Sequence, residues 1–202
     1  MTQPLLTRQA ERDKPALRPH ADIHLTLARV HEACGPARRT FAMWLAGQMQ
    51  DTVLWIAPAW EPEQLNPDGM LAWADPARFL FVHPKRPEDV LWCMEEALRS
   101  GVVPLVVADV PGLPGLTPVR RMHLAAETGA ELGNPPLGLL LTPGEGGAQG
   151  IESRWHMAGA HQDRARRWRL ERRRARTQPV KAWIAEQTGA RQPLSLAPTP
   201  AL

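Results

Sequence analysis

Residues 25–49 read LTLARVHEACGPARRTFAMWLAGQM, and this stretch decides the fold class. An apolar run ends at a Cys-Gly-Pro turn, after which apolar residues recur with the spacing of an amphipathic helix. A strand, a glycine turn and a helix in this order form the layout of a phosphate-binding loop, whose backbone N–H groups surround phosphate. We therefore expect a strand at about 25–33 and a helix at about 38–50.

The residues of this loop depart from the phosphate-binding pattern, which needs Gly, four residues and then Gly-Lys-Ser/Thr. Gly35 is followed by Pro-Ala-Arg-Arg-Thr-Phe, so the second Gly and the Lys are missing. The degenerate loop consists of Gly35, Pro36, Arg38, Arg39 and Thr40. Arg38 and Arg39 stand where a helix start favours an anion, but the missing Gly-Lys favours the alternative that they are solvated residues of the first turn.

Composition places the chain among globular proteins. Its 202 residues are 44% apolar, which suits one domain with a substantial core. The two cysteines, Cys34 and Cys93, form no CxxC motif and no Cys/His cluster, which indicates a reducing compartment and no structural metal. No segment resembles a signal peptide, and none approaches the ~18 apolar residues of a membrane span. We expect a soluble, cytoplasmic protein without a membrane partner.

Strand and helix patterns alternate along most of the chain, which predicts an α/β fold with a mostly parallel central sheet. Further strands are expected at about 52–57, 79–83, 102–110 and 137–141, and further helices at about 68–73, 88–100 and 118–128. Three last strands, at about 153–158, 167–176 and 180–186, are expected to form an antiparallel extension at the sheet edge. One domain would span 23–187, with a flexible arm at 1–22 and a disordered tail at 188–202.

Positive charge is concentrated near the C-terminal end. Residues 151–181 contain ten Lys/Arg and three Asp/Glu, whereas the rest of the chain contains 14 and 18. This asymmetry indicates a polyanionic partner, and single-stranded DNA is one candidate. The candidate binding residues are Arg164, Arg166, Arg167, Trp168, Arg169, Arg172, Arg173, Arg174 and Arg176.

The tryptophans that lie beside arginines and lysines in this C-terminal basic segment allow two interpretations. Aromatic rings can stack on bases while arginines contact phosphates, and Trp155, Trp168 and Trp183 lie beside basic residues. The alternation of Trp168 and Leu170 with arginines equally describes a half-buried edge hairpin. The other tryptophans considered lie in apolar helices and strands and are expected in the core: Trp44, Trp55, Trp73 and Trp92.

Several segments, in their order and spacing, resemble the RecA-type ATPase core. They are CGPARRTFAMWLA at 34–46, PEDVLWCMEEALRSGVVPLVVADV at 87–110, and TPVRRMHLAAETGA with PPLGLLLTP at 117–143. The ending RWRLERRRARTQPVKAWIAE at 167–186 resembles the C-terminal hairpin of ImuA-like proteins, which are RecA-fold relatives from bacterial mutagenesis cassettes and are sometimes labelled SOS cell-division inhibitors. The resemblance covers roughly residues 24–187.

The resemblance implies a RecA-like P-loop fold, with Asp109 in the place of the carboxylate that holds Mg²⁺ through water. The place of the family's catalytic Glu is near Pro58, and that of its γ-phosphate-sensing Gln is at Thr142 and Pro143. Phosphoryl transfer depends on positioned cations and an oriented nucleophile, so we expect no efficient ATP hydrolysis. No cofactor is expected; ATP and Mg²⁺ would be the ligands of a residual site.

The resulting expectation is a non-enzymatic accessory protein of SOS mutagenesis and translesion synthesis. By resemblance, its partners would be RecA, a polymerase-like subunit of the mutagenesis complex, or both. Two alternatives stay open: a DNA-binding module that uses the Arg-rich hairpin, and a weak ATPase that uses Asp109. The cell-division label is supported by no residue pattern in this chain.

Overall fold

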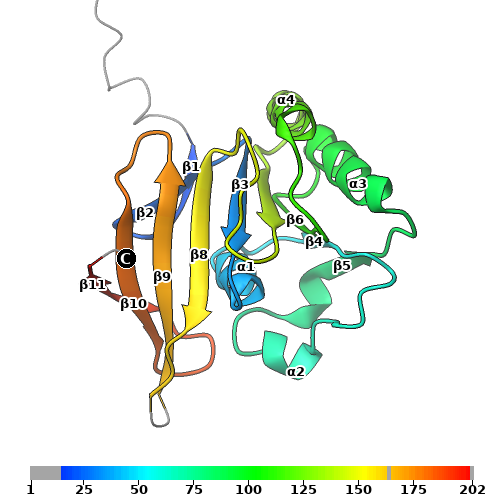
Figure 1. The fold of residues 1–202 in the computed structure, drawn as a ribbon. Coiled ribbons are helices and arrows are strands. Elements are labelled where there is room, and N and C mark those ends of the chain that lie inside the picture. Colours follow the sequence, from blue (N-terminus) through cyan, green and yellow to red (C-terminus); the bar gives the residue numbers. More distant parts are fainter. Residues whose placement is uncertain (1–14, 163–164, 201–202) are drawn as a thin grey trace, which may run out of the picture.

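The structure, a computed structural model, describes residues 15–162 and 165–200, and a nine-stranded sheet forms its centre (Figure 1). In spatial order the strands are β11 (Ser195–Thr199), β10 (Lys181–Gln187), β9 (Arg166–Ala175), β8 (Ser153–Gly159), β3 (Arg29–Cys34), β7 (Leu137–Leu141), β6 (Leu105–Asp109), β4 (Val53–Ile56) and β5 (Phe79–Val82). The strands from β8 to β5 pair in parallel, and those from β8 to β11 pair antiparallel. The expected α/β fold with an antiparallel C-terminal extension is confirmed.

Helices cover both faces of this sheet. One face carries α1 (Arg38–Gly47), the short α2 (Pro67–Met70), a 3-10 turn (Pro76–Arg78) and a separate hairpin of β1 (Ala16–His20) and β2 (Ile23–Thr26). The opposite face carries α3 (Pro87–Ser100) and α4 (Leu116–Leu132), which pack side by side (Figure 1). Each face has its own buried apolar cluster, so the parallel strands between them are covered on both sides.

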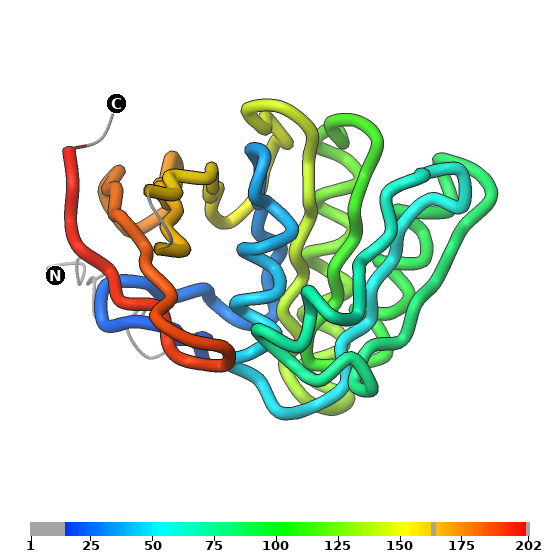
Figure 2. Tube along the Cα trace, turned by 90° about the horizontal axis from the view of Figure 1, so that it is seen from below, coloured from blue at the N-terminus to red at the C-terminus, as the bar shows by residue number. Residues whose placement is uncertain are grey.

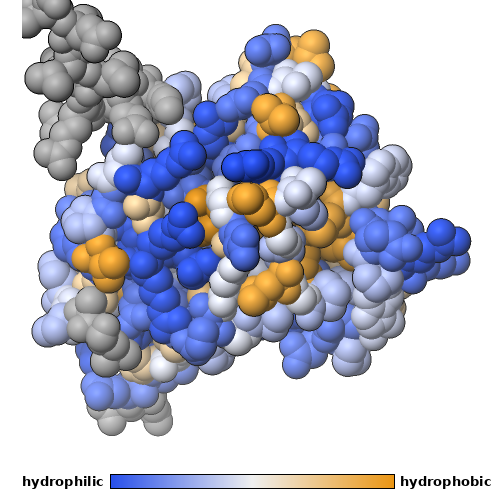
Figure 3. Space-filling model, turned by 45° about the horizontal axis from the view of Figure 1, so that its top comes forward, coloured by the Kyte–Doolittle hydropathy of each residue, from blue (hydrophilic) through white to orange (hydrophobic). Residues whose placement is uncertain are grey.

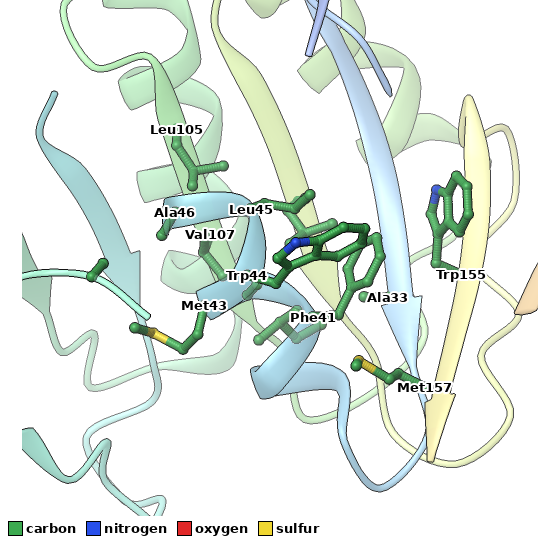
Figure 4. Close-up of a cluster of buried hydrophobic side chains, with 14 of the residues drawn as sticks. Ala33, Phe41, Met43, Trp44, Leu45, Ala46, Leu105, Val107, Trp155 and Met157 are labelled. Carbon is green, nitrogen blue, oxygen red and sulfur yellow. The ribbon is translucent and has the colours of Figure 1, made fainter. Parts of the chain in front are cut away.

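Helix α1 is held firmly by aromatic packing (Figure 4). The ring of Phe41 stacks on that of Trp155 from β8, with centroids 5.6 Å apart, and meets Trp44 edge-on at 5.8 Å. Trp155 in turn stacks on Trp183 of β10 at 6.2 Å. Since aromatic pairs add to the burial of apolar area, this row fixes α1, and with it the turn that precedes α1, against the sheet.

Several element boundaries differ from the expected ones for local reasons. The expected strand at 25–33 divides into β2 and β3, because Ala28 between them has a φ of 54°. The strand expected from 102 begins at Leu105, directly after Pro104, which has no N–H to donate to a sheet. Helix α1 ends at Gly47 rather than near 50, and α4 extends over 116–132 rather than 118–128.

Both ends of the chain contain more structure than expected. Residues 16–20 of the expected arm form β1, and residues 195–199 of the expected tail form β11. Figure 2 shows the N-terminal hairpin beside the C-terminal strands, where Arg172 donates to the carbonyl of Asp22 and Lys181 pairs with its carboxylate at 2.7 Å. The N-terminal hairpin thus contacts β9 and β10, and β11 extends the sheet by pairing with β10. The remainder of the expected arm, residues 1–14, lies outside the described residues.

The prediction of a core position is wrong for Trp92. This side chain is 57% exposed, whereas Trp44 and Trp55 are almost fully buried and Trp73 is half-buried. Helix α3 packs on the sheet through Val90, Met94 and Leu98, which share one side of the helix. Trp92 lies about 200° around the helix from Val90 and therefore points to solvent.

Candidate functional site

The expected nucleotide site lies at the carboxyl ends of β3, β6 and β7. The chain leaves β3 toward α1 on one face of the sheet, whereas it leaves β6 toward α4 on the other face. In open α/β sheets the crevice where the connections change face is the usual place for a ligand. The structure brings Arg38, Arg39 and Asp109 together there.

Asp109 forms ion pairs with both arginines of the degenerate loop. Its Oδ2 lies 2.6 Å from Arg39 Nε and its Oδ1 lies 3.4 Å from Arg38 Nη2, and its side chain is only 5% exposed. Arg39 also contacts Glu63 at 2.9 Å. The carboxylate that would hold Mg²⁺ and the cations that would hold phosphate therefore neutralise each other within the chain.

The backbone of the loop is also engaged within the protein. Gly35 N donates to the carbonyl of Gly144 at 2.9 Å, Ala37 N to that of Met157 at 2.9 Å, and Arg38 N to that of Gly35 at 3.2 Å. Pro36 has no N–H to offer. Three amides of the loop thus donate within the protein rather than toward a ligand.

Gly35 lets this turn lie directly on β8. Its φ is +86°, a conformation that side chains rarely adopt, and a Cβ there would stand 2.6 Å from both Met157 O and His156 Nε2. Close packing on β8 therefore requires a glycine at this position. The glycine can be explained by this packing alone, without a ligand. Thr40 follows in the first turn of α1 and is half-buried.

Beside this loop lies a fully buried carboxylate that sequence reasoning missed. Glu32 of β3 is 0% exposed and accepts from Thr142 Oγ1 at 2.7 Å, from Gly147 N at 2.8 Å and from Ala148 N at 3.0 Å. Its other oxygen lies 2.5 Å from Arg154 Nε of β8. Buried charges are found where they are paired and hydrogen-bonded, and Glu32 meets both conditions. It fastens the turn after β7 to β3 and β8.

His31 forms a second buried chain of hydrogen bonds that the sequence did not reveal. Its Nε2 lies 2.9 Å from the carbonyl of Thr26, which can only accept, so Nδ1 accepts from Ser153 Oγ at 2.7 Å. Trp155 Nε1 in turn donates to that hydroxyl at 2.7 Å. Burial lowers the pKa of His31 from 6.5 to about 4, so the ring is neutral near pH 7. The only sign of these two buried polar sites in the sequence is that His31 and Glu32 interrupt an apolar strand pattern.

Cys34, at the end of β3, has the properties of a structural cysteine. Its Sγ lies 3.2 Å from the carbonyl of Glu145 and 3.4 Å from that of Trp155. Burial, together with the nearby charge of Glu32, raises the pKa of its thiol to about 12. Reactive cysteines need an accessible thiolate, and this one has none at neutral pH.

Three of the six arginines of β9 are paired with carboxylates. Glu171 lies 2.6 Å from Arg169 Nε and 2.9 Å from Arg173 Nε, and Arg167 lies 2.7 Å from Glu186. Although burial opposes it, hydrogen bonds from Arg169 and Arg173 hold the pKa of Glu171 below its usual value. Half of the β9 arginines that were expected to meet a polyanion are thus compensated by carboxylates of the protein itself.

The tryptophans of this segment are buried rather than presented to solvent. Trp168 is 7% exposed and packs against Trp73 and His161. Trp155 and Trp183 are fully buried, and the guanidinium of Arg172 lies over both rings, 5.6 Å and 5.4 Å from their centroids. The half-buried hairpin, the second interpretation of the sequence, describes these contacts. None of the three rings offers a face on which a base could stack.

Within the described residues, three arginines of the run are exposed: Arg166, Arg174 and Arg176. Arg164 lies outside the described residues. We expect single-stranded DNA to bind weakly, with a slope of log affinity against log salt near −2, since each phosphate contact contributes about −0.7. A filter-binding or anisotropy titration between low and physiological salt measures it. A slope of about −5 or steeper would show that the paired arginines open to contact phosphates, which would restore the DNA-binding alternative.

Comparisons with protein-family models and with curated proteins found no match to this chain. In residues 15–162 and 165–200, no group of three or more His, Cys, Asp or Glu side chains is arranged to hold a metal ion. No helix in the described part of the chain has the length and apolar composition that crossing a bilayer requires.

Proposed function

We propose that this chain is a non-hydrolytic accessory protein with a degenerate RecA-like fold, acting in DNA-damage-induced mutagenesis and translesion synthesis. By the resemblance, RecA or a polymerase-like subunit of the mutagenesis complex would be its partner. The observation that carries the proposal is the pair of contacts from Arg38 and Arg39 to Asp109. By the resemblance, this is the place where a RecA-type ATPase holds phosphate and Mg²⁺, so ion pairs within the chain there support a role in binding over one in catalysis.

The layout around this place supports the fold assignment. Strand β3, its glycine turn and α1 follow one another as the resemblance implies, and Asp109 ends a buried strand of the same sheet. The internal bonds of the Gly35 and Ala37 amides support the absence of nucleotide binding. A protein that binds no nucleotide can present the same surface to a partner whether or not ATP is present.

We expect MgATP not to bind. A ligand present at 100 times its dissociation constant stabilises a protein by about 2.7 kcal/mol, so a thermal melt with 1 mM MgATP detects binding with a dissociation constant of about 10 µM or tighter. The expected result is an unchanged Tm and no ATP turnover. Turnover that Asp109→Ala abolishes would overturn this expectation and establish the weak ATPase.

The partner is tested by recovering the tagged full chain from DNA-damaged cells of its source after nuclease treatment. Nuclease-resistant recovery of RecA or of a translesion polymerase subunit is the expected result. Recovery of nucleoid proteins alone, and only without nuclease, would contradict the proposal and point to the basic hairpin instead.

A further inference from the structure

A groove of about 430 Å³ runs along α4, on the face of the sheet opposite α1. Its α4 wall presents Leu116, Arg120 and Leu124, which stand one turn apart on one side of the helix and span about 12 Å. The opposite wall is formed by Gly150 and Glu152 of the loop before β8 and by Arg176 after β9. Figure 3 shows apolar surface surrounded by hydrophilic surface on this side of the molecule.

The groove is a built feature of the fold. His123 of α4 forms its floor: Nε2 lies 3.1 Å from the carbonyl of Gly150, and Nδ1 lies 3.3 Å from Val30 N. Gly150 has a φ of +80°, and a Cβ there would stand 2.7 Å from Leu116 Cδ1. Any side chain at position 150 would therefore narrow the groove at its apolar end.

Apolar side chains line this groove without a partner. Leu124 is 61% exposed and Leu116 is 37% exposed, on a helix whose other side is fully buried against the sheet. Exposed leucines repeated at helical spacing beside a hollow match the surface that receives an amphipathic helix. Single exposed leucines elsewhere on a protein need no such explanation, but these two belong to one groove.

The charges of the groove select the partner. Arg29 at the floor is held by Glu127, and it lies 3.8 Å from Glu152. Arg120 has no ion-pair partner among the described residues, and Arg176, whose side chain is 66% exposed, reaches Glu152 only at 3.9 Å. His123 is neutral near pH 7, because burial lowers the pKa of its ring. One arginine on each wall is thus available to a negatively charged ligand.

We propose that this groove binds an acidic, leucine-bearing helical segment of another protein. Leucines of that segment would lie on Leu116 and Leu124, and its carboxylates would meet Arg120 and Arg176. This inference rests on the proposed function in one respect, namely that the chain acts by binding a protein. The chain's own residues 1–14 are less complementary, since Arg8, Arg12 and Lys14 outnumber Glu11 and Asp13.

The test uses the full chain and three fluorescein-labelled 14-residue peptides. The first carries leucines at i, i+3 and i+7 with glutamates between them; the second replaces Glu by Lys; the third replaces Leu by Ala. Fluorescence anisotropy should show the Leu/Glu peptide binding about tenfold tighter than either control, a difference of about 1.4 kcal/mol. Equal binding of the Leu/Lys peptide, or no binding of the Leu/Glu peptide, overturns the proposal.

Variants locate the binding. Arg120→Glu and Leu124→Ser should each lower the affinity for the Leu/Glu peptide about tenfold. Two control variants should leave the affinity unchanged: Leu132→Ser, whose side chain is 72% exposed at the end of the same helix, and Lys85→Glu, on an exposed loop. Circular dichroism and thermal melts establish that each variant is folded. Loss of binding in the two control variants as well would place the peptide elsewhere and overturn the assignment.

Other occupants give distinct results. A 14-nucleotide single strand that binds through Arg120 but is indifferent to Leu124→Ser would make the groove a polyanion site. Self-association in sedimentation that Leu124→Ser abolishes would make it an interface between copies of this chain. Peptide binding enhanced by removing residues 1–14 would identify a competing arm and still support the groove. Nucleotide binding, or failure to recover a mutagenesis protein, would refute the proposed function without changing any of these peptide results.

Discussion

Replacing Glu32 by alanine is expected to lower the free energy of unfolding by about 3–5 kcal/mol. The carboxylate is completely buried, and one of its oxygens lies 2.5 Å from Arg154 Nε. Its loss would leave the Arg154 guanidinium without a counter-ion. The amides of Gly147 and Ala148 would lose their acceptor as well. Removing one member of a buried ion pair is costly because the other charge remains buried and uncompensated.

Denaturant unfolding followed by tryptophan fluorescence measures this change. Glu63→Ala is the matched control, because Glu63 also contacts an arginine but its side chain is 74% exposed, so a loss within about 1 kcal/mol is expected. Glu32→Gln keeps an acceptor while removing the charge and should fall between the two. A loss below about 1 kcal/mol in Glu32→Ala would mean that the turn after β7 relaxes without cost and that Glu32 does not fasten it.

Lowering the pH from 7 to 4 is expected to destabilise the protein by about 3 kcal/mol through His31 alone. The pKa of this ring is lowered from 6.5 to about 4 in the folded chain, because the ring is fully buried. The unfolded state therefore binds the proton more readily. The stabilisation is complete above about pH 6.5 and is lost as the pH falls from 6.5 to about 4.

Unfolding titrations at a series of pH values test this dependence in the wild type and in His31→Gln. The variant loses some stability at every pH, so the measured quantity is the change in free energy of unfolding between pH 7 and pH 4. That change should be smaller in the variant by about 3 kcal/mol. Burial also lowers the pKa values of His24, His123 and His156, so a residual dependence of the same sign is expected in both proteins. Parallel curves would show that His31 does not titrate in this range.

Local patterns predicted the order of the elements well. Continuous apolar runs such as 53–56 and 137–141 became strands covered on both faces, and the apolar period of 87–100 became α3. These patterns succeed because burial on a helix or strand repeats with the period of the element itself. They fail for Trp92, since an aromatic residue in an apolar helix need not share the buried side.

The candidate site divides in the same way. The missing Gly-Lys after Gly35 and the positions of Arg38, Arg39 and Asp109 are readable in the chain, because a phosphate-binding loop is a local motif. Their ion pairs are not readable, since they join residues about 70 positions apart. The burial of Trp168 against Trp73 was equally hidden, because it depends on which face of β9 meets the core.

Element order, fold class and the departure of residues 35–40 from the phosphate-binding pattern thus follow from the chain alone, because each depends on neighbours within one turn or one strand. Tertiary structure decided the rest. Parallel strands distant in sequence lie edge to edge, and this brought Glu32 to Arg154 across 122 positions and placed His31 beside Ser153. It also set α4 beside the loop at Gly150 to form the groove. Charges and hydrogen bonds act over a few ångströms of space, and sequence separation carries no information about that distance.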